Sequence, residues 1–524
     1  MTAGRALARA GLVVTGASFV SRILGWVRLA VISTTFGVQG DLDAFFAAFR
    51  LPDLLFQLVA AGAIGSALIP TIATLFASGE EARAWRVVST ILNLMLIVLG
   101  VLAAVVFVFA PAIVPAITPG FDPARADRAI ELTRIMLLSP ILLAGGSVAT
   151  SVLNSRGRFG ASVLAPIVYN LAIIGGAVFL APSMGVTGLA VGVVAGAACQ
   201  VLVQLPAMVR RAGFRYSAAI DLRDREARTT LALLVPRAIG LAGAQLQLIA
   251  ATTLASGLAV GSVAAFNIAF TTFQIPIGVF AFPLGIVALP ALSQRYAAGA
   301  VDEFASLVHR SLRLMAFVMV PLGIFGSVAA YQLLDLLFGY GKVDAAGLEL
   351  TAAALVVFFL ALPAETAIVV LARAFFAGRD TRVPVATALV GAALSVAISV
   401  ATVGRLGVFG LALGISVASW LEALLLLAVL DRRFPAVRVA GVLRGVALFA
   451  VLGVTAGVAL RLTLAGGAAL LGSDPAKIGL AAELAAAGLV GGLTYLALSL
   501  VAGVPEVPAI VRLLRGALGR AGGS

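Results

Sequence analysis

The sequence predicts an all-α integral membrane protein, and three observations indicate this fold class. Hydrophobic residues make up 62% of the 524 residues and charged residues only 11%, which is too little charge to cover a soluble fold of this size. Apolar runs such as 91–111, 386–403 and 445–460 approach the roughly 20 residues that a helix needs to cross hydrocarbon. The arginines lie mostly in short loops between such runs, as the positive-inside rule predicts.

The composition also excludes several kinds of function. The net charge is +13, but the basic residues recur along the chain and do not form one continuous patch, so we expect no nucleic-acid partner. Cys199 is the single cysteine and His309 the single histidine, which excludes an internal disulfide and a Cys/His metal site. No Gly-x-x-x-x-Gly-Lys-Ser/Thr motif occurs, so we expect neither nucleotide nor any other cofactor.

The apolar runs predict about fourteen transmembrane helices. The expected spans are 11–36, 43–76, 87–118, 128–154, 160–181, 187–209, 229–257, 261–293, 304–332, 347–377, 383–403, 407–430, 441–464 and 478–503. Arginine-rich and arginine-poor loops alternate to the end of the chain, which indicates an even number of spans and two cytoplasmic termini. The first span resembles a signal peptide but continues to residue 36 without a cleavage site, so we expect a retained helix. The tail 505–520 has the pattern of a short interfacial helix.

Two motifs occur twice in the chain. LNSRGRFGASVLAP at 153–166 resembles FFAGRDTRVPVAT at 375–387, and GVTGLAVGVVAGA at 185–197 resembles GVFGLALGISVAS at 407–419. Matching motifs at matching spacing predict two homologous six-helix lobes in a pseudo-twofold relation, with the substrate between them. The alternative is a chance likeness of Gly/Ala/Val-rich helices. The expected domains are an N-lobe at 1–215, a C-lobe at 216–435, and a C-terminal helix pair with its tail at 436–524.

Arginines inside the first span are the strongest functional signal, because a charge at bilayer depth is costly unless it faces protein or water. Arg22 and Arg28 are roughly 120° apart around a helix, so both can face one broad cavity. Ser21 and Gly25 share a face with Arg28 and leave room for a ligand. A guanidinium fork matches the oxygen pair of a phosphate, which favours a pyrophosphate ligand. Alternatively, one or both arginines extend to a membrane surface.

Further polar residues occur in the second and seventh spans. Asp43 is expected either to pair with Arg50 or Arg28 or to cap the second helix. Arg237 follows Pro236, where the seventh helix is expected to kink, and we expect Arg237 to line a cavity. Gln245 lies farther along the same span, where it either lines that cavity or ties two helices together.

The segment SRILGWVRLAVISTTFGVQGDLDAFFAAFRLPDLLFQLVAAGAIGSALIPTIA at 21–73 resembles the opening signature of the MurJ/MviN family of lipid II flippases, in the MATE-like exporter superfamily. The matching elements are Ser21-Arg22, Gly25, Arg28, Phe36-Gly37, Asp43-Ala44-Phe45, Pro52, Gly62 and Pro70. Residues 261–293 resemble the family's eighth helix, and the likeness covers roughly 10–435. It implies alternating-access transport of undecaprenyl-pyrophosphate-linked peptidoglycan precursor across a bacterial plasma membrane, with cavity arginines on the pyrophosphate.

The sequence also departs from that family's pattern. Phe56-Gln57 and Thr271-Thr272 stand where the family usually carries cavity arginines, and Leu29 replaces an acidic residue. We hypothesise that Arg50 and Arg237 supply the lost charge. The predicted pyrophosphate ligands are therefore Arg22, Arg28, Arg50 and Arg237, and the predicted cavity or gating residues are Ser21, Gly25, Asp43, Gln245 and Gln274.

The leading functional hypothesis is a non-enzymatic lipid II flippase. It is expected to act as a monomer among membrane lipids, with an ion gradient as one energy source. The missing arginines keep open a flippase for another polyprenyl-pyrophosphate-linked saccharide, or a MATE-like drug exporter. A membrane enzyme would need paired carboxylates or a metal site, and nothing beside Asp41 and Asp43 completes one. A non-transporting scaffold would have no need of intramembrane arginines.

Overall fold

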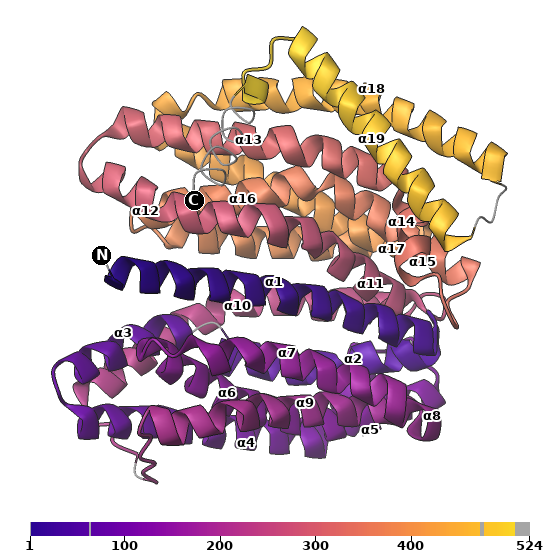
Figure 1. Cartoon of the computed structure of the whole chain (residues 1–524). Coiled ribbons are helices and arrows are strands. Elements are labelled where there is room, and N and C mark those ends of the chain that lie inside the picture. The colour runs from indigo at the N-terminus through magenta and orange to yellow at the C-terminus, as the bar shows by residue number, and fades with distance from the viewer. Residues whose placement is uncertain (1, 62–63, 219, 472–475, 509–524) are drawn as a thin grey trace. The chain divides into compact units, whose positions relative to one another are not determined.

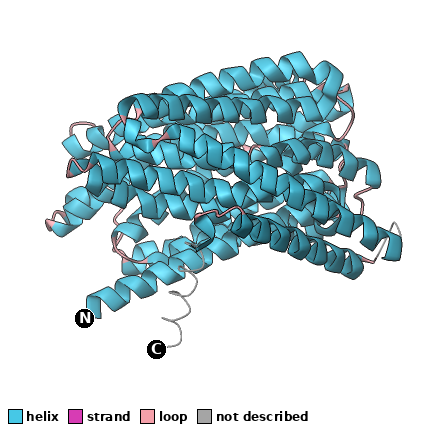
Figure 2. Ribbon diagram, turned by 90° about the horizontal axis from the view of Figure 1, so that it is seen from above, coloured by secondary structure: helices cyan, strands magenta, loops and turns pink. Residues whose placement is uncertain are grey.

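The computed structural model describes residues 2–61, 64–218, 220–471 and 476–508, and every regular element in these ranges is a helix (Figures 1 and 2). The predicted all-α class is thus confirmed. The first ten α-helices with their π-helical turns are α1 (Thr2–Phe36), α2 (Gly40–Phe56), η1 (Gln57–Ala61), α3 (Ile64–Ala77), α4 (Glu81–Ile117), α5 (Pro123–Met136), α6 (Leu138–Ser155), α7 (Phe159–Gly175), η2 (Gly176–Leu180), α8 (Ala181–Met184), α9 (Val186–Pro206), η3 (Ala207–Arg211) and α10 (Arg225–Ser256).

The second half of the chain continues in the same way. Its helices are α11 (Ser262–Pro276), η4 (Ile277–Ala281), α12 (Phe282–Ala297), α13 (Val301–Val328), α14 (Ala330–Phe338), α15 (Ala345–Leu360), α16 (Leu362–Ala377), α17 (Arg382–Arg433), η5 (Pro435–Val437), α18 (Val439–Leu471) and α19 (Lys477–Val501). Most of the tail predicted as an interfacial helix lies outside the described residues.

Ten described helices are long and apolar enough to cross a membrane, or eleven if the bent pair α15 and α16 forms one span. The chain is therefore a multi-pass membrane protein. The expected second span falls on α2, η1 and α3, which are separate elements, and the expected eleventh and twelfth spans both lie within α17, on either side of a kink. Within α17, Gly407 has a non-helical φ of 57°, at the junction where the sequence predicts two helices to meet. The count of about fourteen stays a prediction.

Two compact units divide the chain, namely Met1–Ala264 with Tyr340–Gly347, and Ala265–Gly339 with Leu348–Ser524. In the first unit, α7 packs on α1 and α9, and α6 packs on α9. Gly188 and Gly192 of α9 allow close approach to η2, the turn that continues α7, because a Cβ at Gly188 would lie 2.7 Å from the carbonyl carbon of Leu180 and one at Gly192 would lie 3.0 Å from the Cα of Gly176. Small residues four apart commonly let membrane helices touch through their backbones.

In the second unit, α18 packs between α13 and α19, and α16 packs on α13 and α17 (Figure 1). Gly453 and Gly457 of α18 lie against Ile324 of α13, with hypothetical Cβ distances of 2.9 and 3.0 Å. These contacts again use small residues to bring two apolar helices together.

Backbone features recur at one spacing in the two halves of the chain. Gly157 and Arg379 both have a positive φ, of 68° and 60°, and so do Gly185 and Gly407, at 58° and 57°. The separation is 222 residues in both pairs (379 minus 157, and 407 minus 185). The same turn bond follows each first position, from Arg158 N to Leu153 O at 2.8 Å and from Asp380 N to Phe375 O at 3.0 Å.

These recurrences support our proposal of two homologous six-helix lobes. A positive φ is costly for a residue other than glycine, so its recurrence at Arg379 is hard to explain by composition alone. The predicted boundary after residue 215 remains a proposal. The division by contacts places α10 in the first compact unit, whereas the repeat makes it the first helix of the C-lobe.

A short linker between η3 and α10 is bound along α4. Asn93 donates to Ser217 O at 2.9 Å, and Ser89 Oγ and Thr90 Oγ1 accept from the backbone N–H groups of Ser217 and Asp221 at 3.1 Å each. The linker ends at Asp224, which caps α10 by accepting from the backbone N–H groups of Glu226 and Ala227.

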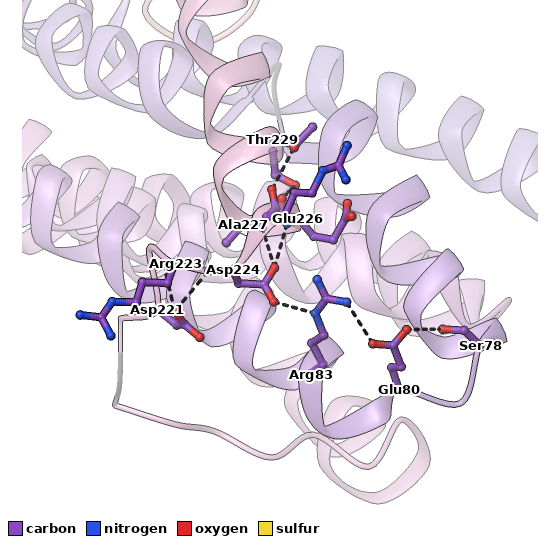
Figure 3. A network of polar contacts seen from close by, with 11 residues as sticks. Ser78, Glu80, Arg83, Asp221, Arg223, Asp224, Glu226, Ala227 and Thr229 are labelled. Carbon is purple, nitrogen blue, oxygen red and sulfur yellow. Dashed lines mark hydrogen bonds and ion pairs between the residues drawn. The ribbon is translucent and has the colours of Figure 1, made fainter.

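Arg83 ties this cap to the turn before α4 (Figure 3). Arg83 Nε lies 2.6 Å from Asp224 Oδ2, and Arg83 Nη1 lies 3.0 Å from Glu80 Oε2. Partial burial opposes the charge on Asp224, but the Arg83 guanidinium and the two backbone donors hold the pKa of this carboxyl below its ordinary value.

We therefore expect Asp224→Asn to lower the Tm of the purified protein by about 1–2 °C at pH 7. Asparagine keeps the helix cap and removes the charge. A depressed folded-state pKa stabilises the fold above about pH 4, and the contribution is lost as the pH falls through the lower folded value. The wild-type and variant Tm values should thus converge toward pH 3. Equal differences at pH 7 and pH 3 would show that the ion pair does not contribute.

Candidate substrate-binding site

A cavity of about 270 Å³ opens inside the first unit. Its wall brings together α1, α2, α6, α7 and α9, with η1 at one edge. The lining residues are Arg28, Phe49, Pro52, Asp53, Phe56, Gln57, Ser139, Leu143, Tyr169 and Gln200. Pro52 lies within α2, and α2 passes directly into a π-helical turn at Gln57. Irregular turns of this kind are common at functional sites in helices.

Arg28 is the cationic residue of this cavity. It makes no hydrogen bond or ion pair with any residue that the structure describes. It interacts electrostatically with Tyr169 of α7. Gly25 leaves space one turn earlier, because a Cβ there would meet only Asn170 Oδ1, at 3.9 Å. The Arg28 guanidinium is therefore available to an anion that enters the cavity.

Asp53 is the anionic residue of the same cavity. It accepts hydrogen bonds from the side chains of Gln57, at 3.4 Å, and Gln245. Arg50, one turn earlier on α2, interacts electrostatically with it. Gln245 thus reaches the edge of the predicted site through Asp53, in agreement with a cavity or helix-tying role.

Arg50 itself is not among the cavity-lining residues. Its side chain is buried, at 7% exposure, and its Nε donates to Thr252 Oγ1 of α10 at 2.9 Å. The structure thus places Arg50 as a tie between α2 and α10 beside the cavity.

Replacing Arg50 with alanine is expected to lower the Tm by several degrees, because a charged hydrogen bond of about 1.5–3 kcal/mol is lost and Asp53 loses its cationic neighbour. The double variant Arg50→Ala/Asp53→Asn should regain part of that loss, since it also removes the unpaired carboxylate. Thermal unfolding of the two single variants and the double variant measures the coupling. If the Tm losses of the two single variants simply add in the double variant, Arg50 and Asp53 are not coupled.

Asp43 lies in a different place from the one the sequence predicts. Its carboxylate is buried at 1% exposure and accepts from Gly261 N at 2.6 Å and Ala264 N at 2.8 Å. Arg125 Nη1 lies 3.8 Å from Asp43 Oδ2. Asp43 therefore caps the start of α11 and pairs with Arg125. We expected Asp43 to pair with Arg50 or Arg28, or to cap its own helix, and these expectations are wrong. The start of α11 lies against α2, so its backbone N–H groups reach the Asp43 carboxylate.

Close to Asp43 lies a cluster of three loops, 37–39, 257–261 and 340–344, which we call the loop cluster. Lys342 N donates to Thr34 O at 2.9 Å. A Cβ at Gly261 would overlap the carbonyl oxygen of Val38, and one at Gly341 would overlap that of Thr34. Both glycines have a positive φ, so two separate constraints favour glycine there.

Ser21, Arg22 and Gln274 are predicted site residues that are not among the cavity-lining residues. Arg22 and Gln274 are exposed, Ser21 is half-buried, and the backbone oxygen of Ser21 accepts from Asn170 at 3.4 Å. Arg237 lies within α10, but its side chain is outside the described residues.

Among the lining residues, the sequence identified Arg28 alone as a site residue. The polar lining residues that it missed are Asp53, Gln57, Ser139, Tyr169 and Gln200. The sequence contains a signal for Asp53 and Gln57, because polar residues four apart share one face of an apolar helix. Tyr169 and Gln200 gave none beyond being polar inside predicted spans, because only packing brings α7 and α9 to the cavity.

The fold is similar to that of solved MurJ and MATE family structures. The chain resembles a solved structure described as the lipid II flippase MurJ in an inward closed conformation, with a TM-score of 0.78 and 20% identity over 94% of this chain and 98% of that one. It also resembles an inward-facing MATE family multidrug resistance transporter, with a TM-score of 0.66 and 17% identity over 80% and 95%.

A family model described as "Lipid II flippase MurJ" matches residues 32–471. The lipid II flippase MurJ of Burkholderia cenocepacia is 32% identical over 436 residues, which cover 82% of this chain and 84% of that protein. A probable lipid II flippase MurJ of Rhizobium tropici is 28% identical, with 80% of each chain covered. The chain belongs to the MurJ lipid II flippase family, as its opening signature predicts.

Proposed function

We propose that this protein flips lipid II from the cytoplasmic to the outer leaflet of a bacterial plasma membrane by alternating access. Membership of the MurJ family supports this function. The observation that carries it is Arg28, an arginine on the wall of an intramembrane cavity with no ion pair or hydrogen bond to the described residues. A half-buried cation that has no ion pair within the described part of the chain favours an anionic ligand.

In the proposed mechanism, the Arg28 guanidinium binds the pyrophosphate through two parallel N–H donors. Arg22 on the same helix and Arg237 on α10 remain predicted contacts of the same ligand. Arg50 contributes by position, since it holds α10 against α2 beside the cavity. The bulk of the binding energy is expected from charge, because the aromatic residues Phe49 and Phe56 offer the cavity only apolar walls.

The loop cluster is proposed as the outer gate of the transport path. With both termini on the cytoplasmic side, the three loops lie on the outer face of the membrane. Asp43 holds them closed through the start of α11, where the backbone N–H groups and the helix dipole favour a carboxylate. Release of substrate outward requires these bonds to break.

The same function leads to proposals about the class of the protein, its oligomeric state and its energy source. The protein is a transporter and not an enzyme, it acts as a monomer among membrane lipids, and an ion gradient is one source of its energy. Export of a drug is the second candidate, and a cavity with a carboxylate and aromatic walls is the observation in its favour. The MATE structures are the more distant relatives, with lower TM-scores.

Complementation of MurJ depletion, combined with a leaflet assay for lipid II, tests the proposal. The protein is expected to restore growth and to expose lipid II on the outer leaflet. If it is inserted in the membrane at normal levels and does neither, the function is a different one. Resistance to organic cations in the same cells would then favour drug export.

A further inference from the structure

We propose that Asp53 determines specificity in the cavity by accepting a hydrogen bond from an O–H or N–H group of the sugar attached directly to the substrate's phosphate. This inference rests on the proposed function, because it assigns a second subsite beside Arg28. It makes the headgroup, and not only the pyrophosphate, part of what the cavity recognises.

The cavity carries opposite charges on separate parts of its wall. Arg28 and Asp53 both line it, yet no ion pair joins them within the described part of the chain. Tyr169 lines the same cavity and interacts electrostatically with both. A ligand that fills this cavity therefore meets both a cation and an acceptor-only carboxylate.

The cavity volume limits which part of the substrate reaches Asp53. Its 270 Å³ falls below the about 300–1,000 Å³ of pockets that enclose drug-sized ligands. With a phosphate on Arg28, the remaining space suits one sugar ring. The group that donates to Asp53 is therefore assigned to the first sugar, which is the part of the headgroup attached to the phosphate.

A purely structural role for Asp53 is the competing explanation, because Gln57 and Gln245 already donate to it. However, a carboxylate has about four acceptor positions, and the Gln57 bond is long, at 3.4 Å. Gln245 also keeps a buried side-chain oxygen without a partner among the described residues. The network thus retains polar capacity that a ligand hydroxyl or amide can use.

The test measures binding of three probes to the purified full-length protein in nanodiscs by native mass spectrometry. The probes are undecaprenyl pyrophosphate, its N-acetylmuramyl-pentapeptide conjugate and the corresponding disaccharide-pentapeptide conjugate. Asp53→Asn is expected to weaken the binding of both sugar-bearing lipids by about tenfold, the usual difference between a charge-assisted and a neutral hydrogen bond. The affinity for undecaprenyl pyrophosphate should stay within about twofold of the wild-type value. Arg28→Gln should weaken all three.

Two further variants make the result specific. Asp41→Asn removes an exposed carboxylate from the same helix and should change no probe. Asp53→Glu keeps the charge beside Arg50 and moves the carboxylate by one methylene, so it should lose the same selectivity with little change in Tm. If Asp53→Asn does not fold, the Asp53→Glu result decides.

The outcomes separate this inference from the proposed function. Equal weakening of all three probes, or no weakening, overturns the role of Asp53 while leaving the flippase function in place. Failure of the wild-type protein to bind any of the three refutes the proposed function itself. Binding of tetraphenylphosphonium by the wild-type protein that Asp53→Asn abolishes would make Asp53 an organic-cation site and overturn the inference.

Discussion

Arg28→Gln is expected to abolish growth of MurJ-depleted cells that depend on this protein. Glutamine keeps the length and polarity of the side chain but loses the charge and the guanidinium fork. Because Arg28 has no ion pair to lose among the described residues, the substitution should not destabilise the fold. The leaflet assay should show lipid II exposure reduced by about tenfold or more, the usual cost of a charge-assisted phosphate contact.

Arg128→Gln is the matched control, because Arg128 is an exposed arginine of the same compact unit whose one ion pair among the described residues is with exposed Glu131, at 3.2 Å. It should support normal growth. Arg28→Lys is expected to retain part of the activity, since lysine keeps the charge without the planar fork. Normal growth of cells with Arg28→Gln at normal membrane levels would remove Arg28 from the substrate path.

Asp43→Ala is expected to open the loop cluster and to reduce transport strongly. The variant loses two charge-assisted hydrogen bonds to the start of α11, each of about 1.5–3 kcal/mol, and leaves Arg125 without a buried partner. Opening can be read from Val38, which is buried at 7% exposure. In a Cys199→Ala background, a Val38→Cys side chain should resist a membrane-impermeant maleimide in the parent protein and react in the Asp43→Ala variant.

Asp41→Ala serves as the control for that experiment, since Asp41 is an exposed acidic residue two positions earlier on α2. It should leave the labelling unchanged. Labelling of Val38→Cys at equal rates with and without the Asp43 carboxylate would show that Asp43 does not hold the loops together. Labelling only from the cytoplasmic side would refute the proposed orientation.

The sequence predicted those site residues whose charge is energetically costly inside an apolar helix. Arg28 was identified because a charge inside an apolar run needs a reason, and the cavity supplies one. Arg50 was expected on the pyrophosphate, but it bonds to Thr252 across 202 positions of sequence. Such a partner cannot be inferred from local pattern, because any helix of the bundle has the polar hydroxyls to provide it.

Asp43 is a second residue whose partner could not be predicted from the sequence. The sequence marks it as a carboxylate near a helix start, which suggests a cap. It does cap a helix, but the helix is α11, more than two hundred residues away. Helix N-termini attract carboxylates whether or not they belong to the same segment, so sequence proximity is a poor guide to which one is bound.

The amino-acid sequence by itself determined the membrane class, the intramembrane arginines and the family signature, because each depends on composition or on residues close together in the chain. Only the tertiary structure decided which polar residues share a cavity. Asp53, Tyr169 and Gln200 meet Arg28 there because α2 and α7 pack on α1 and α9 packs on α7. Apolar helices carry little sequence information about such neighbours. In lipid, close packing of small residues selects those neighbours, and that selection is a property of the assembled bundle.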